Sequence, residues 1–168
     1  GDLHGDLLSK ALFAEAKKHS IDLEIIGLGG ERMHKAGVKI LKDTTSISAI
    51  GLWEVLPHIF PMIKIQKNFL KSLVRNRPNC LILIDYMGPN IQIGRKFKRI
   101  NSKIPIYYYI APQEWAWRVG NNTSTDLVRF SDKIFAIFKQ EASFYKRRGG
   151  NVLWLSLIHI SEPRRRYR

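Results

Sequence analysis

Short apolar runs alternate with amphipathic segments along this chain, and that alternation restricts the fold more than any other feature. The clearest run is Leu81–Ile84, which contains no polar side chain and is followed by a helical pattern over Ile91–Ile100. Strands without polar positions are typical of parallel sheets, because helices cover both faces of such sheets. The sequence therefore predicts an α/β domain with a mostly parallel sheet.

The same alternation predicts the remaining elements. We expect strands over residues 23–28, 104–110, 133–138 and 152–154, and helices over residues 3–18, 31–36, 52–77 and 140–148. Residues 38–50 fit no single pattern. Pro57 and Pro61 should kink the long helix, because proline removes a backbone donor. The strand that normally precedes the first helix is missing, which indicates that the chain is a fragment.

The two ends of the chain also indicate a fragment. The chain opens on Gly1 without a methionine, and residues 155–163 resemble the translation of a sequencing adapter. We therefore expect residues 1–154 to form a partial N-terminal domain and residues 155–168 to be a non-native tail that contributes nothing to the fold. Without the four arginines and one glutamate of this tail, the net charge of +14 becomes +11. Such a charge favours an anionic partner, either nucleic acid, anionic lipid or a phosphorylated substrate.

The cysteine content and the hydropathy pattern indicate the redox compartment of the chain and whether it contains a membrane-spanning helix. Cys80 is the only cysteine, so no disulfide can form within the chain, and a lone thiol beside an apolar strand fits a reducing compartment. A zinc site is not expected, because the histidines lack metal-ligand spacing. We find no secretory signal and no run of about 18 apolar residues, so no membrane-spanning helix is predicted.

A single carboxylate, Asp85, follows the apolar run Leu81–Ile84. In open α/β sheets, ligands bind beyond the carboxyl ends of the strands. A carboxylate at that place can act as a general base or accept a hydrogen bond from a sugar hydroxyl. The alternative is that Asp85 caps the helix that begins near Pro89. The residues alone leave both interpretations open.

Aromatic side chains cluster with an arginine after the Tyr-rich strand, at Trp115, Trp117 and Arg118. Aromatic faces beside a planar guanidinium fit a sugar or a nucleobase that carries a phosphate. The alternative is a structural aromatic plug over the edge of the sheet. The glycine cluster Gly27–Gly30 is a weaker signal, because it permits close approach of a ligand but also forms ordinary turns.

The segment from Leu52 to Val74 is apolar beyond the needs of one core-facing stripe. The expected core stripe is Leu52, Val55, Leu56, Ile59, Phe60, Ile63, Leu70, Leu73 and Val74, and Met62, Ile65 and Phe69 widen it. Lysines flank the widened stripe. This combination suits an acyl chain or an anionic membrane surface. A buried helix with a solvated basic edge is the alternative.

Taken together, these segments resemble the lipid-A-disaccharide synthases, a family of bacterial glycosyltransferases, from Gly1 to about Trp154. The most specific motif is Pro-x-x-Trp-Ala-Trp after a Tyr-rich strand. The matching motifs are Gly1–Gly5, Gly27–Met33, Ile50–Leu56, Ile84–Asn90, Ala111–Arg118, and Glu141 with Phe144 and Tyr145. Met87 and Pro89 depart from the Pro and Phe that the family commonly shows in the Asp85 loop, and Lys139-Gln140 replaces its Pro-Phe before Glu141.

This resemblance implies the N-terminal, acceptor-side half of a GT-B enzyme, with a Rossmann-like parallel sheet flanked by helices and its first strand missing. It implies transfer of diacylglucosamine from UDP-2,3-diacylglucosamine to 2,3-diacylglucosamine 1-phosphate, which gives the β-1,6-linked lipid A disaccharide precursor and UDP. No cofactor, no metal and no nucleic acid are implied. The location is cytoplasmic and peripheral to the inner membrane, with a homodimer conceivable for the full-length enzyme.

The resemblance also assigns roles to residues. Asp85 is the expected catalytic base. The expected substrate-binding residues are Asp2, Asn90, Gln113, Trp115, Trp117 and Arg118, and the expected acyl-chain or membrane contacts are Leu52, Leu56, Phe60, Ile63 and Phe69. The isolated chain is expected to be inactive, because half of the cleft is absent. A basic α/β module that binds nucleic acid or another phosphorylated partner is the alternative function.

Overall fold

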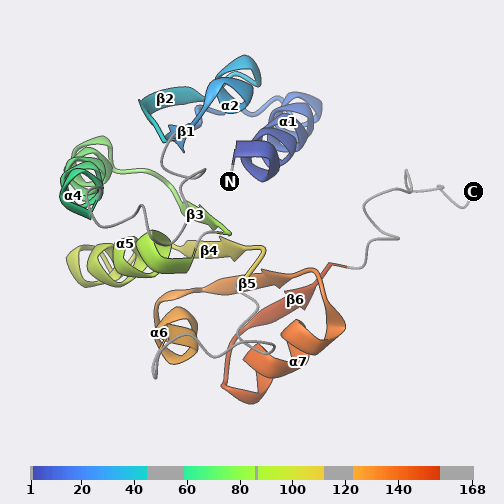
Figure 1. Ribbon diagram of the computed structural model, residues 1–168. Coiled ribbons are helices and arrows are strands. Elements are labelled where there is room, and N and C mark those ends of the chain that lie inside the picture. Colours follow the sequence, from blue (N-terminus) through green and yellow to red (C-terminus); the bar gives the residue numbers. More distant parts are fainter. Residues whose placement is uncertain (1, 45–58, 86, 112–122, 156–168) are drawn as a thin grey trace, which may run out of the picture. The chain divides into compact units, whose positions relative to one another are not determined.

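The computed structural model describes residues 2–44, 59–85, 87–111 and 123–155, and it divides the chain into two compact units, Gly1–Asn76 and Arg77–Arg168 (Figure 1). All strand pairs found in the described residues are parallel. The predicted α/β fold with parallel sheets flanked by helices is therefore confirmed. None of the described helices is long and apolar enough to cross a membrane.

The first unit contains a two-stranded sheet and helices. Its elements are α1 (Asp2–Lys18), β1 (Ile26–Gly29), α2 (Glu31–Lys35), β2 (Lys39–Asp43) and α4 (Ile59–Asn76). Helix α2 packs against the sheet, and α1 packs against α2. Strand β1 pairs with β2 in parallel, with an irregularity in register between Gly27 and Leu28. Strand β2 lies within the stretch that sequence patterns left unassigned. The predicted kink at Pro57 lies outside the described residues.

The buried side chain of Met33 packs closely against two glycines of the first unit, Gly5 and Gly29. A Cβ atom at Gly5 would lie 2.5 Å from Met33 Sδ, and one at Gly29 would also overlap this sulfur. Larger residues at either position would therefore displace Met33, which is 7% exposed. Within the glycine cluster Gly27–Gly30, Gly29 at the end of β1 thus permits close packing of a methionine from α2, rather than only a turn.

The buried face of α4 differs from the predicted core stripe. Among the α4 side chains that the structure describes, from residue 63 onward, those of Gln66, Phe69, Leu70 and Leu73 are buried, whereas Ile63 and Val74 are 41% and 47% exposed. The prediction that Ile63 and Val74 face the core is therefore wrong. Each residue turns an α-helix by about 100°, so Val74 points well away from Leu73, and Ile63 lies a turn before the buried stripe begins.

The second unit contains a four-stranded parallel sheet in the order β3-β4-β5-β6 (Figure 1). Its elements are β3 (Leu81–Ile84), α5 (Met87–Ile100), β4 (Ile106–Tyr109), α6 (Thr123–Phe130), β5 (Lys133–Ala136), α7 (Lys139–Arg147) and β6 (Val152–Trp154). Leu81 pairs with Ile106 and Ile84 with Tyr109, so β3 and β4 end at the same level.

Helix packing distinguishes the two faces of this sheet. Tyr108 is fully buried and contacts the ring of Phe130 from α6, with centroids 6.4 Å apart. Phe130 in turn fills the space beside Gly94 of α5, where a Cβ would lie 2.5 Å from its ring. Tyr107 points to the opposite face, is partly exposed, and packs edge-on against Phe135 at 6.3 Å. Alternation along β4 thus gives neighbouring tyrosines different surroundings.

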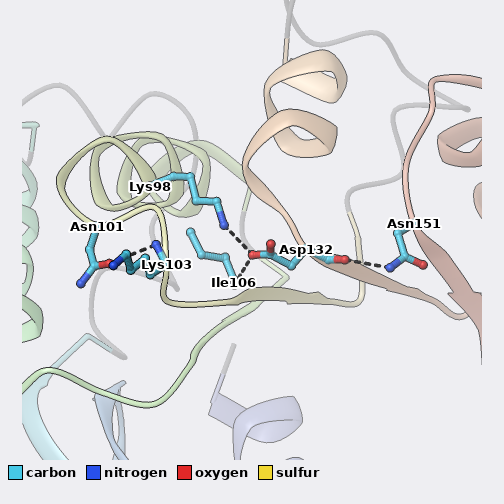
Figure 2. A network of polar contacts seen from close by, with 6 residues as sticks. All are labelled: Lys98, Asn101, Lys103, Ile106, Asp132 and Asn151. Atoms are coloured by element: carbon cyan, nitrogen blue, oxygen red, sulfur yellow. Dashed lines mark hydrogen bonds and ion pairs between the residues drawn. The ribbon is translucent and has the colours of Figure 1, made fainter.

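Asp132 joins three strands at the amino-terminal edge of the sheet (Figure 2). Its Oδ2 accepts hydrogen bonds from Lys98 Nζ at 2.7 Å and from the Ile106 N–H at 2.8 Å, and its carbonyl accepts one from Asn151 at 2.9 Å. Burial alone would raise the pKa of Asp132, but the hydrogen bonds from Lys98 and Ile106 outweigh burial and hold it below its ordinary value.

Glu141 caps helix α7 just beyond the carboxyl end of β5. Its Oε2 accepts the N–H groups of Ile137 at 3.1 Å and Phe138 at 3.3 Å, and the residue is fully buried. Its Oε1 is buried without a hydrogen-bond partner in the described part of the chain. Burial raises the pKa of Glu141 to about 7 and outweighs the two backbone hydrogen bonds, which lower it.

Asp132→Ala should lower the free energy of unfolding at pH 7 by about 1–3 kcal/mol, because it leaves the buried Ile106 N–H without an acceptor. Asp132→Asn keeps an acceptor oxygen and should lose about 1 kcal/mol or less, since the Lys98 ion pair is partly exposed. The pKa of Asp132 is lower in the folded chain than its ordinary value of 3.8. The contribution of Asp132 to stability is therefore present above pH 3.8 and is lost as the pH falls through the lowered pKa of the folded chain. Urea unfolding at several pH values measures both effects, and equal losses in the two variants would contradict this account.

Glu141 should give the opposite pH response. The ordinary pKa of a glutamate is 4.5, whereas the pKa of folded Glu141 is about 7. Between pH 4.5 and about pH 7, the folded chain therefore keeps a proton that the unfolded chain has released. Stability should therefore fall as the pH rises through this window, by up to about 3 kcal/mol. Glu141→Gln should flatten this part of the profile in urea unfolding experiments. The exposed control Glu31→Gln should leave it unchanged, and a profile that keeps its slope in Glu141→Gln would contradict the assignment.

Candidate active site

Asp85 follows β3 at the carboxyl edge of the second unit's sheet, where the sequence predicts it. Its N–H donates to the Tyr109 carbonyl at 3.0 Å, so β3 and β4 stay paired one residue beyond the strand end. Its φ is 50°, in the left-handed region, which costs an L-residue roughly 1–2 kcal/mol and is tolerated best by Asn and Asp among side-chain-bearing residues. The strand therefore ends in a sharp change of backbone direction at Asp85.

The neighbouring strand ends in the same unusual way. Ile110 follows β4, has a φ of 57°, and donates its N–H to the Phe135 carbonyl at 3.1 Å. The register of β3 and β4 places Ile110 beside Asp85. A β-branched residue rarely adopts this conformation, and such strain is concentrated at functional sites. Two adjacent left-handed residues make this edge the strongest candidate site in the described chain.

Two side chains hold the backbone of Asp85. The hydroxyl of Tyr108 donates to the Asp85 carbonyl at 2.8 Å. The side-chain amide of Asn90 donates to the same carbonyl at 2.8 Å and to the Ile84 carbonyl at 3.0 Å. Asn90 was predicted to bind the sugar, but its donor group is directed to the backbone. In the structure, Asn90 therefore stabilises the turn between β3 and α5.

The arrangement supports acid–base chemistry at a fixed point. A carboxylate at the open end of a strand can accept a proton from a hydroxyl that approaches within about 2.6–3.2 Å. Helix α5 begins at Met87, only two residues after Asp85. The turn is therefore short, and Asp85 lies both at the edge of the sheet and directly before the first turn of α5. The described residues contain no group of three or more His, Cys, Asp or Glu side chains that could hold a metal ion.

The other predicted site residues are distributed over both units. Asp2 begins α1, Ile63 is exposed on α4, and Phe69 belongs to the buried stripe of α4. Phe60 lies in the first turn of α4, where the structure describes only the backbone. The remaining predicted residues, Leu52, Leu56, Gln113, Trp115, Trp117 and Arg118, lie outside the described residues. Asp85 and Asn90 are the predicted residues that the structure brings together.

A basic cavity of about 280 Å³ lies elsewhere in the second unit, between α5 and α6. Among its lining residues, Arg95 forms an ion pair with Asp126 at 3.2 Å, and Lys98 forms one with Asp132, outside the lining, at 2.7 Å. Asp85 does not line this cavity. The cavity is therefore not part of the candidate active site.

Sequence reasoning did not identify Tyr108 as part of the site. The sequence shows a Tyr-rich strand, but three consecutive tyrosines do not reveal which ring points toward the helices. Alternation relative to the buried Ile106 was the signal that could have separated Tyr108 from Tyr107 and Tyr109. Even then, the hydrogen bond of Tyr108 depends on the pairing of β3 with β4.

Comparisons with known proteins identify one family over almost the whole chain. The family model described as lipid-A-disaccharide synthetase matches residues 1–156. Proteins named lipid-A-disaccharide synthase from Prochlorococcus marinus and Gloeothece citriformis are 47% and 44% identical to this chain over 155 residues, which is 92% of the chain. The one from Synechocystis is 40% identical over the same length.

The matched segment is a minor part of these relatives. It spans 40% of the Prochlorococcus marinus protein and 39% of the Synechocystis protein. The motif with Asp85 and Asn90, the glycines that pack against Met33 and the cap residue Glu141 all lie within the matched range. This chain therefore belongs to the lipid-A-disaccharide synthetase family.

Proposed function

We propose that this chain forms the acceptor-side, N-terminal half of a GT-B glycosyltransferase of lipid A biosynthesis. The reaction is transfer of diacylglucosamine from UDP-2,3-diacylglucosamine to the 6-hydroxyl of 2,3-diacylglucosamine 1-phosphate. The products are the β-1,6-linked disaccharide and UDP. Family membership supports the reaction class, and the observation that carries the proposal is the left-handed Asp85 at the carboxyl edge, held by Asn90 and Tyr108.

In this proposal Asp85 is the general base. The acceptor hydroxyl is a poor nucleophile until its proton moves to the carboxylate. The acceptor oxygen then forms a bond to the anomeric carbon of the donor sugar, while the bond between that carbon and the UDP oxygen breaks. UDP leaves with the bonding electrons, and Asp85 later releases its proton to solvent. One carboxylate is sufficient on this half, because a single displacement inverts the anomeric carbon.

Substrate binding is proposed from residue chemistry. Arg118 would pair with a phosphate, and Trp115 and Trp117 would pack against a sugar or base. Asp2, Asn90 and Gln113 would offer hydrogen bonds to the polar parts of the substrates, with the Asn90 amide also bound to the backbone.

Helix α4 is the proposed contact for acyl chains and the inner membrane. Exposed Ile63 lies beside exposed Lys64 and Lys67, a combination that suits the boundary between acyl chains and anionic headgroups. Leu52, Leu56 and Phe60 would extend this surface. Phe69 belongs to the buried stripe of α4, so the surface does not depend on it. This proposal gives the enzyme a peripheral position on the cytoplasmic side of the inner membrane.

The role of Asp85 can be tested in a chimera in which this chain's matched segment replaces the equivalent segment of the Prochlorococcus marinus relative. Asp85→Asn should lower kcat by a hundredfold or more, because the acceptor keeps its proton, while KM for the acceptor changes little. The control Asp22→Asn, at an exposed position, should leave both constants unchanged. Turnover of Asp85→Asn at the level of the parent chimera would remove Asp85 from the base role.

The membrane contact can be tested with the chain itself by co-sedimentation with vesicles. The chain should bind vesicles rich in anionic phospholipid and not neutral ones. Reversal of Lys64 and Lys67 to Glu should weaken binding about tenfold or more, since each basic residue near such a surface contributes on the order of 1 kcal/mol. The same reversal of the exposed residues Lys17 and Lys18 on α1 is the matched control. Salt-sensitive binding to an oligonucleotide without binding to anionic vesicles would favour the basic nucleic-acid module instead.

A further inference from the structure

We propose that Tyr108 and Asn90 are positioning residues that fix the direction of the Asp85 carboxylate by holding the backbone on both sides of its Cα atom. Neither side chain needs to touch the reacting atoms for this role. The inference rests on the proposed function of Asp85 as base, and it explains why the strand end adopts a disfavoured conformation.

Tyr108 forms a hydrogen bond with a residue that is distant in the sequence. Its side chain is fully buried among the core residues of β4, yet its hydroxyl reaches the carbonyl of a residue that is 23 positions away in the chain. A phenylalanine would fill the same space against Phe130 without this hydroxyl. The hydroxyl therefore adds a bond to the turn at Asp85 that the packing of the ring does not supply.

Asn90 completes the restraint from the helix side. Its amide donates to the Ile84 carbonyl, which lies in the peptide plane before Asp85, and to the Asp85 carbonyl, which lies in the plane after it. The Asp85 N–H, bound to Tyr109 O, fixes the preceding plane a second time. Because both planes are held, φ and ψ of Asp85 are set, and these angles determine where its Cβ points.

The catalytic consequence follows from the short reach of proton transfer. A base must lie within hydrogen-bond distance of the proton it removes, and a misplacement of about 1 Å can lower a rate about a hundredfold. Without the Tyr108 hydroxyl, the Asp85 backbone could relax toward a commoner conformation and turn the carboxylate away. The loss should therefore affect the chemical step more than acceptor binding.

The chimera described above tests this inference with one atom removed. Tyr108→Phe should lower kcat about ten- to a hundredfold with little change in KM for the acceptor. Tyr107→Phe removes the same atom from the opposite face of the sheet, where the ring contacts Phe135, and should leave kcat unchanged. Added to Asp85→Asn, Tyr108→Phe should cause little further loss, because it acts through the carboxylate that is already absent.

A second measurement on the chain itself reports the backbone directly. Hydrogen exchange at the Asp85 and Ile110 amides should accelerate in Tyr108→Phe, whereas the Ile134 amide, bound to Asn151 O, should keep its protection. Tyr107→Phe should change none of them. Unchanged exchange at Asp85 in Tyr108→Phe would overturn the inference even without an activity assay.

The two proposals fail in different ways. Full activity of Asp85→Asn would remove the base and leave positioning without a purpose. An inactive Asp85→Asn together with a fully active Tyr108→Phe would keep the base and overturn the positioning role. A rate loss of the same size when Tyr108→Phe is added to Asp85→Asn would also overturn it, because the tyrosine would then act independently of the carboxylate.

Discussion

The parallel pairing of β3 with β4 is the interaction on which the candidate site depends. It aligns the ends of the two strands, so that Asp85 lies beside Ile110 and its N–H reaches Tyr109 O. It also brings Tyr108 within hydrogen-bond distance of a residue that precedes α5. A shift of one residue in this register would turn Tyr108 to the other face and remove its contact with both Phe130 and Asp85.

The two edges of the sheet are stabilised by different chemistry. At the amino-terminal edge, Asp132 is partly exposed and joins β4, β5 and β6 through charge-assisted and backbone hydrogen bonds. At the carboxyl edge, the Asp85 turn is held by neutral donors and Glu141 is buried at the start of α7. The solvated ion pair thus lies away from the site.

Much of this fold could be predicted from the sequence, because parallel strands without polar residues are strong signals. Strands β3 and β6 have the predicted bounds, and β4 and β5 differ only at their ends. Helix α6 was not predicted, because it has only eight residues and begins with Thr-Ser-Thr-Asp, which is too short a segment to show a helical repeat of apolar residues. The predicted core stripe of α4 was wrong at Ile63 and Val74, because several faces of that helix are apolar and only tertiary packing selects among them.

The position of Asp85 could also be predicted from the sequence, whereas its restraints could not. A carboxylate after an apolar run identifies the edge, but the partners of its backbone come from β4 and α5. A carbonyl oxygen has two lone pairs, and at Asp85 both receive donors from within the protein. An approaching alcohol therefore meets an Asp85 carbonyl whose two lone pairs are already engaged by Tyr108 and Asn90.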